Sequence, residues 1–548
     1  ASGYSLRLDS CQGTADAESS YDLRQTVLSS DRPGQKWLLV KAADDAKTVP
    51  HMTSSATYTS DGNYLQTATD ARGNTVRYVY DLLSGNLLSV TDPKGTQTAY
   101  TYDAVGRQVS VSGAGSVIQY TYGNDWLRRV SVNDAVQYFF EYDSFGRRTA
   151  TRVGWISGPR TLLSAQSYDS LGRVTQRRYG TGQFVHYTYD TLDRLTELRY
   201  NTGTGTAAYR YIYDAEGRLA RALDNLENRR TDYTYDLAGR LVEQKQRAGQ
   251  EDGSAARLYL RYDYEDGTNR LLRDIAQLDG GASVTTGYTY EAHSDRLVGV
   301  TQNGASRLRY SYDGLGRLSG RALYLSGGGT VNAAYGYVSG AGSQATTALL
   351  GWYDNGFTRN TYGYDSRGNL IYDGQTATGV AASSTPGLQY VYDDLNQLVR
   401  INDVAGGKTY TYTYDNRGNL RQKNEYALST GELGTPTRTV DYGYGNADWQ
   451  DQLTSYNGST ITYDAIGNPT IWYNGTQMTW QKGRQLTGIN SSVSGTTMYT
   501  YDDSGLRTSK AINGVKTEYY RSGSRLIGQK QGSSVMQFLY DANGLYGF

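Results

Sequence analysis

The sequence predicts an all-β protein, organised as a long strip of about 19 antiparallel β-hairpins. A unit of the form Tyr-x-Tyr-Asp-x-x-Gly-Arg/Asn-Leu recurs along the chain, with most neighbouring copies 21–28 residues apart. Tyrosine and glycine are abundant, at 53 and 65 residues. Tyrosine suits a pleated surface and glycine suits turns. Only 7 prolines occur, which fits a backbone held almost entirely in strand ladders.

Each copy of the unit predicts one hairpin. The two tyrosines lie two residues apart, so they share one face of a strand. Asp followed three residues later by Gly is turn chemistry, because Asp can bond back to the backbone and Gly accepts a positive φ. The Arg-Leu or Asn-Leu pair then starts the return strand. Clear copies are Tyr100–Val109, Tyr187–Leu195, Tyr233–Leu241, Tyr310–Leu318 and Tyr412–Leu420.

Further Tyr-Asp pairs, including Tyr262-Asp263, continue the array, and degenerate copies fill its longer gaps. These degenerate copies are Tyr120–Gly123, Tyr288–Glu291, Tyr335–Val338 and Tyr442–Gly445. A lone hairpin is marginally stable in water, so neighbouring hairpins are expected to pair edge to edge into a continuous strip.

The repeats divide the chain into two parts. Residues 1–57 carry no clear repeat and are expected to be an irregular leader or capping segment, or the end of a preceding β-domain. Residues 58–548 form the repeat array. Since the chain begins with Ala1 rather than Met, we expect it to be a piece of a longer polypeptide.

Charge and hydropathy argue against two classes of partner. Lys+Arg and Asp+Glu both number 54, so the net charge is zero and gives no support to nucleic-acid binding. No run of 18 or more apolar residues is present, so no membrane-spanning helix is expected.

The repeated units resemble the Rhs/YD-repeat family, which includes bacterial Rhs proteins, the C component of Tc toxin complexes and the teneurin cores. The resemblance covers about residues 58–548. It implies that the strip spirals and closes into a hollow shell or part of one.

The resemblance also implies a structural function. In the bacterial members the shell encloses a C-terminal toxin domain of the same polypeptide, which serves competition between bacteria. We therefore expect a secreted or surface-exposed shell whose partners are its own toxin domain, absent from this chain, and an N-terminal plug or delivery domain. Self-association stays open as a way to cover exposed strand edges. The toxin's chemistry and the host do not follow from the sequence.

One family feature is not matched. The resemblance implies a plug segment with paired Asp-Pro-x-Gly motifs and aspartyl self-cleavage, but the single motif here, Asp92-Pro93-Lys94-Gly95, lies early and within a repeat. It is expected to be an ordinary turn, so no self-cleavage residue is carried over.

No catalytic, cofactor or metal site is predicted, and the chain is not expected to be an enzyme. His51, His186 and His293 are scattered, and a metal site or triad needs such residues to converge. Cys11 is expected to be a free structural cysteine. The acidic stretch Asp263–Gly267 is interpreted as a solvated hairpin end rather than a cation site.

An alternative function is cell-surface adhesion or carbohydrate binding, as in the teneurin use of the same shell. Rows of tyrosine could stack on sugar rings. Tyrosine at alternating positions of a β-array more often packs against cross-strand neighbours, which favours the structural interpretation.

The turn assignment is tested at Gly106. If this glycine holds a positive φ, Gly106→Val is expected to reduce the free energy of unfolding by about 1–2 kcal/mol. Thermal or chemical denaturation measures this, and an unchanged stability would show that the turn is assigned wrongly.

Overall fold

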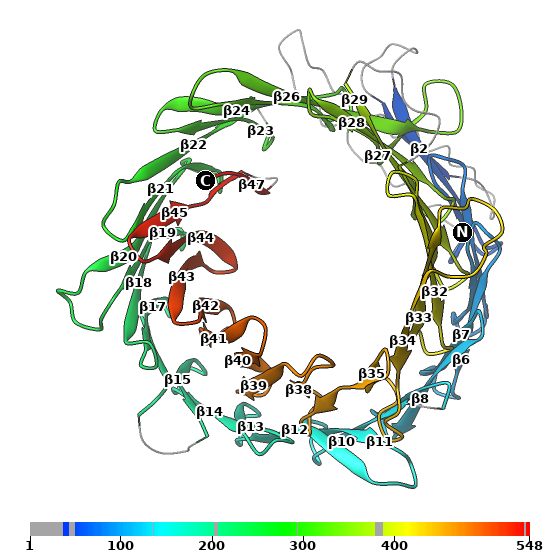
Figure 1. Cartoon of the computed structure of the whole chain (residues 1–548), viewed down its shortest axis with the longest axis horizontal. Coiled ribbons are helices and arrows are strands. Elements are labelled where there is room, and N and C mark those ends of the chain that lie inside the picture. Colours follow the sequence, from blue (N-terminus) through cyan, green and yellow to red (C-terminus); the bar gives the residue numbers. More distant parts are fainter. Residues whose placement is uncertain are drawn as a thin grey trace. The chain divides into compact units, whose positions relative to one another are not determined.

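The computed structural model describes residues 37–42, 50–134, 136–201, 206–292, 294–378, 387–541 and 544–548. Within these ranges the regular structure consists of strands, with no helix (Figure 1). Accordingly, no helix in the described ranges is long and apolar enough to span a membrane. Cys11 and His293 lie outside the described residues. The predicted all-β fold is confirmed.

The first sheet contains 36 strands in the described part of the chain, and its registers pair strands that follow one another in the chain. Its strands are β1 (Trp37–Ala42), β2 (His51–Tyr58), β3 (Leu65–Thr69), β4 (Thr75–Tyr80), β5 (Leu87–Thr91), β6 (Gln97–Tyr102), β7 (Gln108–Gly113), β8 (Ser116–Gly123), β9 (Trp126–Val132), β10 (Val136–Tyr142), β11 (Arg148–Gly154), β12 (Arg160–Tyr168), β13 (Val174–Tyr179), β14 (Phe184–Tyr189), β15 (Leu195–Tyr200), β16 (Tyr209–Tyr213), β17 (Leu219–Asp224), β18 (Arg229–Tyr235), β19 (Leu241–Arg247), β20 (Ala256–Tyr264), β21 (Leu271–Leu278), β22 (Val284–Tyr290), β23 (Leu297–Gln302), β24 (Ala305–Tyr312), β25 (Leu318–Tyr324), β26 (Thr330–Ser339), β27 (Thr346–Asp354), β28 (Thr358–Tyr364), β29 (Leu370–Ala377), β30 (Leu388–Tyr392), β31 (Leu398–Asp403), β32 (Lys408–Tyr414), β33 (Leu420–Ala427), β34 (Arg438–Gly443), β35 (Ser455–Tyr456) and β36 (Ser459–Thr460).

Two smaller sheets follow in the sequence. The second sheet is β37 (Thr462–Tyr463), β38 (Pro469–Ile471), β39 (Gln477–Gln481), β40 (Gln485–Ser491), β41 (Gly495–Tyr501), β42 (Arg507–Ile512), β43 (Val515–Ser522), β44 (Arg525–Gln531) and β45 (Ser534–Gln537). The third is β46 (Leu539–Asp541) with β47 (Gly544–Gly547).

Part of the predicted leader belongs to the first sheet. Strand β1 pairs antiparallel with β2, and β2 pairs with β3. The boundary expected after residue 57 therefore falls inside β2, because this strand continues the ladder without the tyrosine-aspartate signature.

A β-bulge at the second tyrosine recurs in many of the described repeats. In the β14–β15 pair Thr188 lies opposite Glu197, but the next residue, Tyr189, lies opposite Leu195. Thr196 is the extra residue on the return strand. A bulge increases the local twist, so its recurrence bends the strip in the same sense at each hairpin.

The chain forms two compact units, each assembled from separate segments. The first contains Ala1–Thr121, Val130–Ala135 and Leu308–Asp441, and the second contains Tyr122–Arg129, Val136–Arg307 and Tyr442–Phe548. The strip thus enters each unit at least twice, once in its earlier half and once in its later half.

Within each unit the earlier and later passes of the strip lie side by side. In the first unit Arg72 Nη1 donates to the Asp365 carbonyl at 2.7 Å, across 293 residues. In the second unit the Tyr209 hydroxyl donates to the Tyr501 carbonyl at 3.1 Å, across 292 residues. Contacts between residues so far apart in the sequence are expected of a strip that winds back onto itself.

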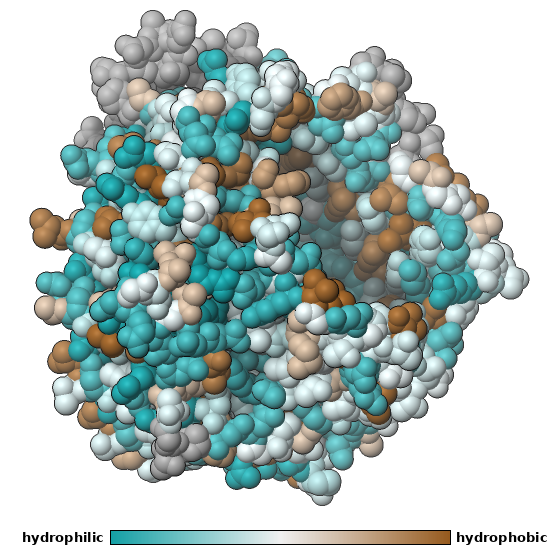
Figure 2. All heavy atoms as spheres, turned by 60° about the vertical axis from the view of Figure 1, so that its left-hand side comes forward, coloured by the Kyte–Doolittle hydropathy of each residue, from teal (hydrophilic) through white to brown (hydrophobic). Residues whose placement is uncertain are grey.

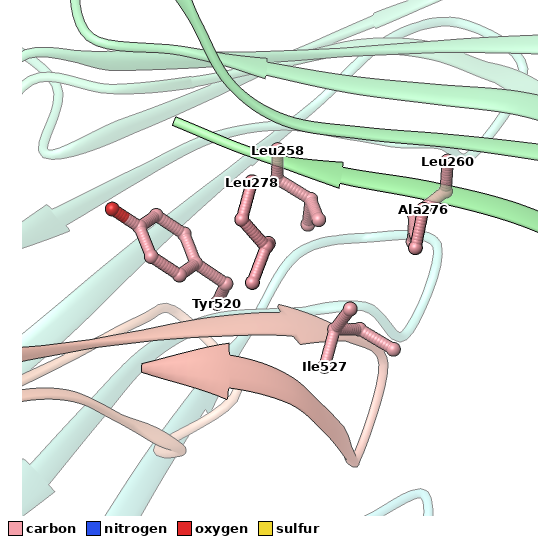
Figure 3. Close-up of a cluster of buried hydrophobic side chains, with 6 residues drawn as sticks. All are labelled: Leu258, Leu260, Ala276, Leu278, Tyr520 and Ile527. Carbon is pink, nitrogen blue, oxygen red and sulfur yellow. The ribbon is translucent and has the colours of Figure 1, made fainter. Parts of the chain in front are cut away.

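The largest apolar core of the second unit lies between its two passes. Leu258 and Leu260 of β20 and Ala276 and Leu278 of β21 pack with Tyr520 of β43 and Ile527 of β44 (Figure 3). Leu258 is fully buried. A second cluster, of Val185, Leu198, Ala208 and Tyr209, lies within the earlier pass. Burial of apolar area between passes therefore contributes to holding the strip wound.

The face of the molecule drawn in Figure 2 is mostly hydrophilic. On the face drawn in Figure 2, apolar side chains are scattered among hydrophilic ones. Such isolated apolar residues are normal on a protein surface.

The core between the passes is tested at Leu258. Leu258→Ala is expected to lower the free energy of unfolding by about 2–5 kcal/mol, because the site leaves a cavity when truncated. The matched control is Leu171→Ala, since Leu171 is 68% exposed and its truncation should change stability by about 0.5 kcal/mol or less. Equal effects of both substitutions in chemical denaturation would contradict the assignment.

Candidate functional site

The repeat turn is organised by one aspartate. In the turn that joins β14 to β15, Asp190 Oδ1 accepts the backbone N–H of Leu192 at 2.9 Å and that of Arg194 at 3.0 Å. Its other oxygen, Oδ2, accepts Arg194 Nε at 2.7 Å. One carboxylate thus closes the turn and orients the arginine side chain.

The arginine of each turn reaches the next repeat. Arg173 Nη1 donates to the Asp190 carbonyl at 3.1 Å, and its guanidinium lies 4.9 Å from the centre of the Tyr189 ring. Tyr189 in turn donates its hydroxyl to the Val174 carbonyl at 3.0 Å. Adjacent hairpins are therefore joined by side chains as well as by backbone ladders.

The tyrosine contact recurs in both units. The second tyrosine of a repeat donates its hydroxyl to the carbonyl of a leucine in the preceding return strand. The pairs are Tyr102–Leu87, Tyr142–Leu127, Tyr213–Leu195, Tyr235–Leu219, Tyr290–Leu271, Tyr337–Leu318, Tyr364–Leu350, Tyr392–Leu370, Tyr414–Leu398 and Tyr501–Leu486. The contact at Tyr337 persists although no aspartate follows that tyrosine.

The environment of the repeat aspartate and tyrosine also shifts their pKa values. The hydrogen bond from the Arg194 N–H is the main cause that holds the pKa of Asp190 below its usual value, and the Arg194 guanidinium adds to it. Burial raises the pKa of the Tyr189 hydroxyl. At neutral pH the Asp190 carboxylate therefore stays ionised and can accept its hydrogen bonds, and the Tyr189 hydroxyl stays protonated and can donate its own.

One predicted repeat has a different register. The pair Tyr262-Asp263 was expected to be the repeat signature, but the hydroxyl that reaches the preceding repeat is that of Tyr264, which bonds the Leu241 carbonyl at 3.0 Å. Glu265 takes the place of the aspartate and accepts Arg270 Nε at 2.6 Å. The prediction was wrong here because a longer acidic side chain closes a longer turn.

Asp263 is correspondingly not part of a hairpin end. It lies in strand β20 and accepts Arg273 Nε at 2.8 Å and Arg261 Nε at 3.2 Å. The interpretation of Asp263–Gly267 as a solvated hairpin end therefore holds only for its last residues.

The predicted turn glycines are confirmed. Gly106 has a φ of +82°, and a Cβ placed there would meet no atom within 4 Å. A substitution at Gly106 is therefore opposed by backbone conformation alone. Gly253 is equally uncrowded and has no such positive φ, so Gly253→Val is the matched control for Gly106→Val. Where glycine is missing, Asp193 and Asn396 adopt φ values of 63° and 62°.

The single Asp-Pro-x-Gly segment is a turn, as expected. Asp92 Oδ1 accepts the N–H of Lys94 at 2.9 Å and that of Thr96 at 3.0 Å. The Asp92 carboxylate also pairs with Arg367 of the later pass in the first unit. Asp92 thus helps to join the two passes.

Two of the three histidines, His51 and His186, lie in the described strands β2 and β14. His51 donates its backbone N–H to the Gln344 carbonyl at 3.0 Å, and His186 Nε2 lies 3.1 Å from Gln176 Nε2. In the part of the chain that the structure describes, no group of three or more His, Cys, Asp or Glu residues is placed to hold a metal ion.

The exposure of turn position two, the residue before the glycine or before the residue that replaces it, differs from turn to turn. In the earlier pass of the second unit Phe145, Leu171 and Leu192 occupy this position and are 81%, 68% and 69% exposed. In the later pass Ile466 occupies it and is 1% exposed. Gly180 of the earlier pass provides the room, because a Cβ there would lie 3.1 Å from Ile466 Cγ2. The sequence alone gave no signal for this difference.

Charged pairs also join the two passes of the second unit. Arg257 Nη1 donates to Glu518 Oε1 at 3.2 Å, and Lys530 pairs with Asp279. The hydrogen bond from Arg257 is the main cause that lowers the pKa of Glu518 from 4.5 to about 2. The Glu518 carboxylate therefore favours the wound strip when it is ionised.

Comparison with known proteins agrees with the repeat geometry. The family model of the RHS repeat matches residues 83–118, 168–206, 213–251 and 392–424. These four segments of the chain are thus similar to the RHS repeat. The double-stranded DNA deaminase toxin A of Burkholderia cenocepacia is 26% identical over 210 residues, which is 36% of this chain and 14% of that protein. Teneurin-4 of Mus musculus is 29% identical over 181 residues, 32% of this chain and 6% of that protein.

A similar solved structure is the crystal structure of TcdB2-TccC3-Cdc42, with 15% identity and a TM-score of 0.46 over 92% of this chain and 33% of that chain. The match to this chain covers 14% or less of the length of these two curated relatives.

The ionised pair between the passes predicts an acid-sensitive stability. Because the folded pKa of Glu518 lies below its value of 4.5 in the unfolded chain, the Arg257 pair stabilises the fold above pH 4.5, and this contribution is lost as the pH falls from about 4.5 towards 2. Glu518→Gln is expected to flatten the fall in melting temperature over that window. A pH profile identical to that of the unsubstituted protein would contradict the pairing.

Proposed function

We propose that this RHS-repeat strip is the wall of an encapsulating shell, which encloses and delivers a C-terminal effector domain of the same polypeptide. The chain itself is not an enzyme in this proposal. The complete protein would be secreted or surface-exposed and would act in competition between bacteria. Its further partner would be an N-terminal plug or delivery domain.

The observation that carries the proposal is the joining of successive passes. Each unit joins segments far apart in the sequence through backbone carbonyls, 293 and 292 residues apart in the two examples above, and through ion pairs, and the second unit also joins them through buried apolar side chains. A strip whose successive passes are joined by such contacts forms a continuous wall. A protein that only binds a ligand on its surface needs one exposed face and no such contacts between passes. The similarity to part of a deaminase toxin supports a toxin-associated wall.

The repeat tyrosines give less support to carbohydrate binding. The hydroxyls of the second tyrosines are bonded to backbone carbonyls of the preceding repeat, and several of these rings lie under arginine guanidinium groups. A ring used in this way is not free to stack on a sugar.

The wall hypothesis is tested by an electron-microscopy map of the purified chain. We expect a curved wall about 10 Å thick, the thickness of one sheet layer, around an interior at solvent density. A solid rod or a flat strip would contradict a wall and favour a binding surface.

Encapsulation is tested on the full native polypeptide. Its C-terminal segment is expected to resist trypsin while the shell is folded and to be digested after acid treatment. The control is the same segment produced alone. Equal digestion of the enclosed and the isolated segment would rule out encapsulation even if the wall is hollow.

A further inference from the structure

A positively charged cavity lies on strands β11, β12 and β13 of the second unit. It has a volume of about 470 Å³, and the later pass contributes Arg484 to its lining. Thr151, Ser164 and Tyr179 lie opposite one another on the three strands and therefore share one face. Their hydroxyl groups, with Arg148 and Arg177, line the same cavity.

The cavity carries three cationic side chains and no acidic one. Arg148, Arg177 and Arg484 line it, and none of its lining residues is Asp or Glu. The repeat arginines behave differently, since Arg173, for example, is neutralised by Asp169 of its own turn at 2.7 Å. The overall charge of the chain is zero, so this cluster is a local excess of positive charge.

Neutral groups hold the three arginines in place. Arg484 Nη2 donates to the Ile466 carbonyl at 2.7 Å, and the Arg148 guanidinium lies 5.1 Å from the centre of the Phe140 ring. With its amide oxygen facing Arg177, Gln166 accepts Arg177 Nη2 at 2.9 Å. These contacts orient the guanidinium groups and use only some of their five N–H donors, and each of them is made to a neutral group.

We propose that this cavity binds a phosphate ester. A single carboxylate is matched by one guanidinium fork, whereas three arginines exceed that need. A phosphomonoester carries nearly two negative charges and three terminal oxygens, which matches three guanidinium groups and the surrounding hydroxyls. The cavity is also larger than an inorganic phosphate, which leaves room for the group that carries the phosphate.

The test is calorimetric titration of the purified chain with inorganic phosphate and with glucose 6-phosphate, each at constant ionic strength. Both are expected to bind, and glucose 6-phosphate more tightly if the remaining volume is used. Arg177→Gln and Arg484→Gln are each expected to weaken binding about tenfold, the effect of losing one charge-assisted hydrogen bond.

The matched control is Arg178→Gln. Arg178 neighbours Arg177 in the sequence, is exposed, and does not line the cavity, so its substitution should leave phosphate affinity unchanged. Melting temperatures show whether each variant is folded.

Three outcomes would overturn the proposal. They are no phosphate binding by the unsubstituted chain, an equal loss of affinity in Arg178→Gln, which would indicate general charge attraction, and tighter binding of citrate than of either phosphate, which would indicate a carboxylate site.

Discussion

The fold depends on the hydrogen-bonded aspartate of the repeat turn. The Asp190 carboxylate accepts two backbone N–H groups with one oxygen and its own arginine with the other. The turn is thereby closed, and the arginine of each turn is aimed at the next hairpin, as Arg173 is at Tyr189. A buried core is not needed at this point, because charge-assisted hydrogen bonds fix the hairpin ends. A strip only one sheet thick can therefore hold its shape with few fully buried side chains.

Winding of the strip depends on a second set of contacts, between segments far apart in the sequence. The strip has two edges, one formed by the repeat turns and one by the opposite ends of the hairpins. The second of these edges in the earlier pass contacts the repeat-turn edge of the later pass. At one such contact the Gln183 side chain donates to the Trp480 carbonyl at 3.3 Å and accepts the Gly483 N–H at 3.1 Å. Local repeats build the strip, and these long-range pairs determine how it is wound. The two sets are physically separate, so the strip and its winding can differ in stability within one molecule.

The local part of this structure could be predicted from the sequence, and the long-range part could not. The spacing of Tyr102, Asp103 and Gly106 is enough to predict a hairpin with a glycine of positive φ, and the structure has it. The register at Tyr264 was missed because the acidic neighbour Asp263 imitates the signature. The burial of Ile466 was invisible, since the same turn position is exposed at Leu171. Its environment is decided by which distant segment lies beside it, and periodicity carries no such information.

Net charge illustrates the same division between local and distant information. The equality of 54 basic and 54 acidic residues argues against a bulk electrostatic partner, and much of it arises because repeat arginines are matched by repeat aspartates. Because this charge balance arises within individual turns, it does not determine which charges lie near the arginines outside the turns. Arg148 and Arg177 come from the strands, and Arg484 comes from a later turn in which no aspartate precedes it. The winding of the strip brings these three arginines to one cavity that has no acidic lining residue, so a chain with no net charge can still present a cationic site.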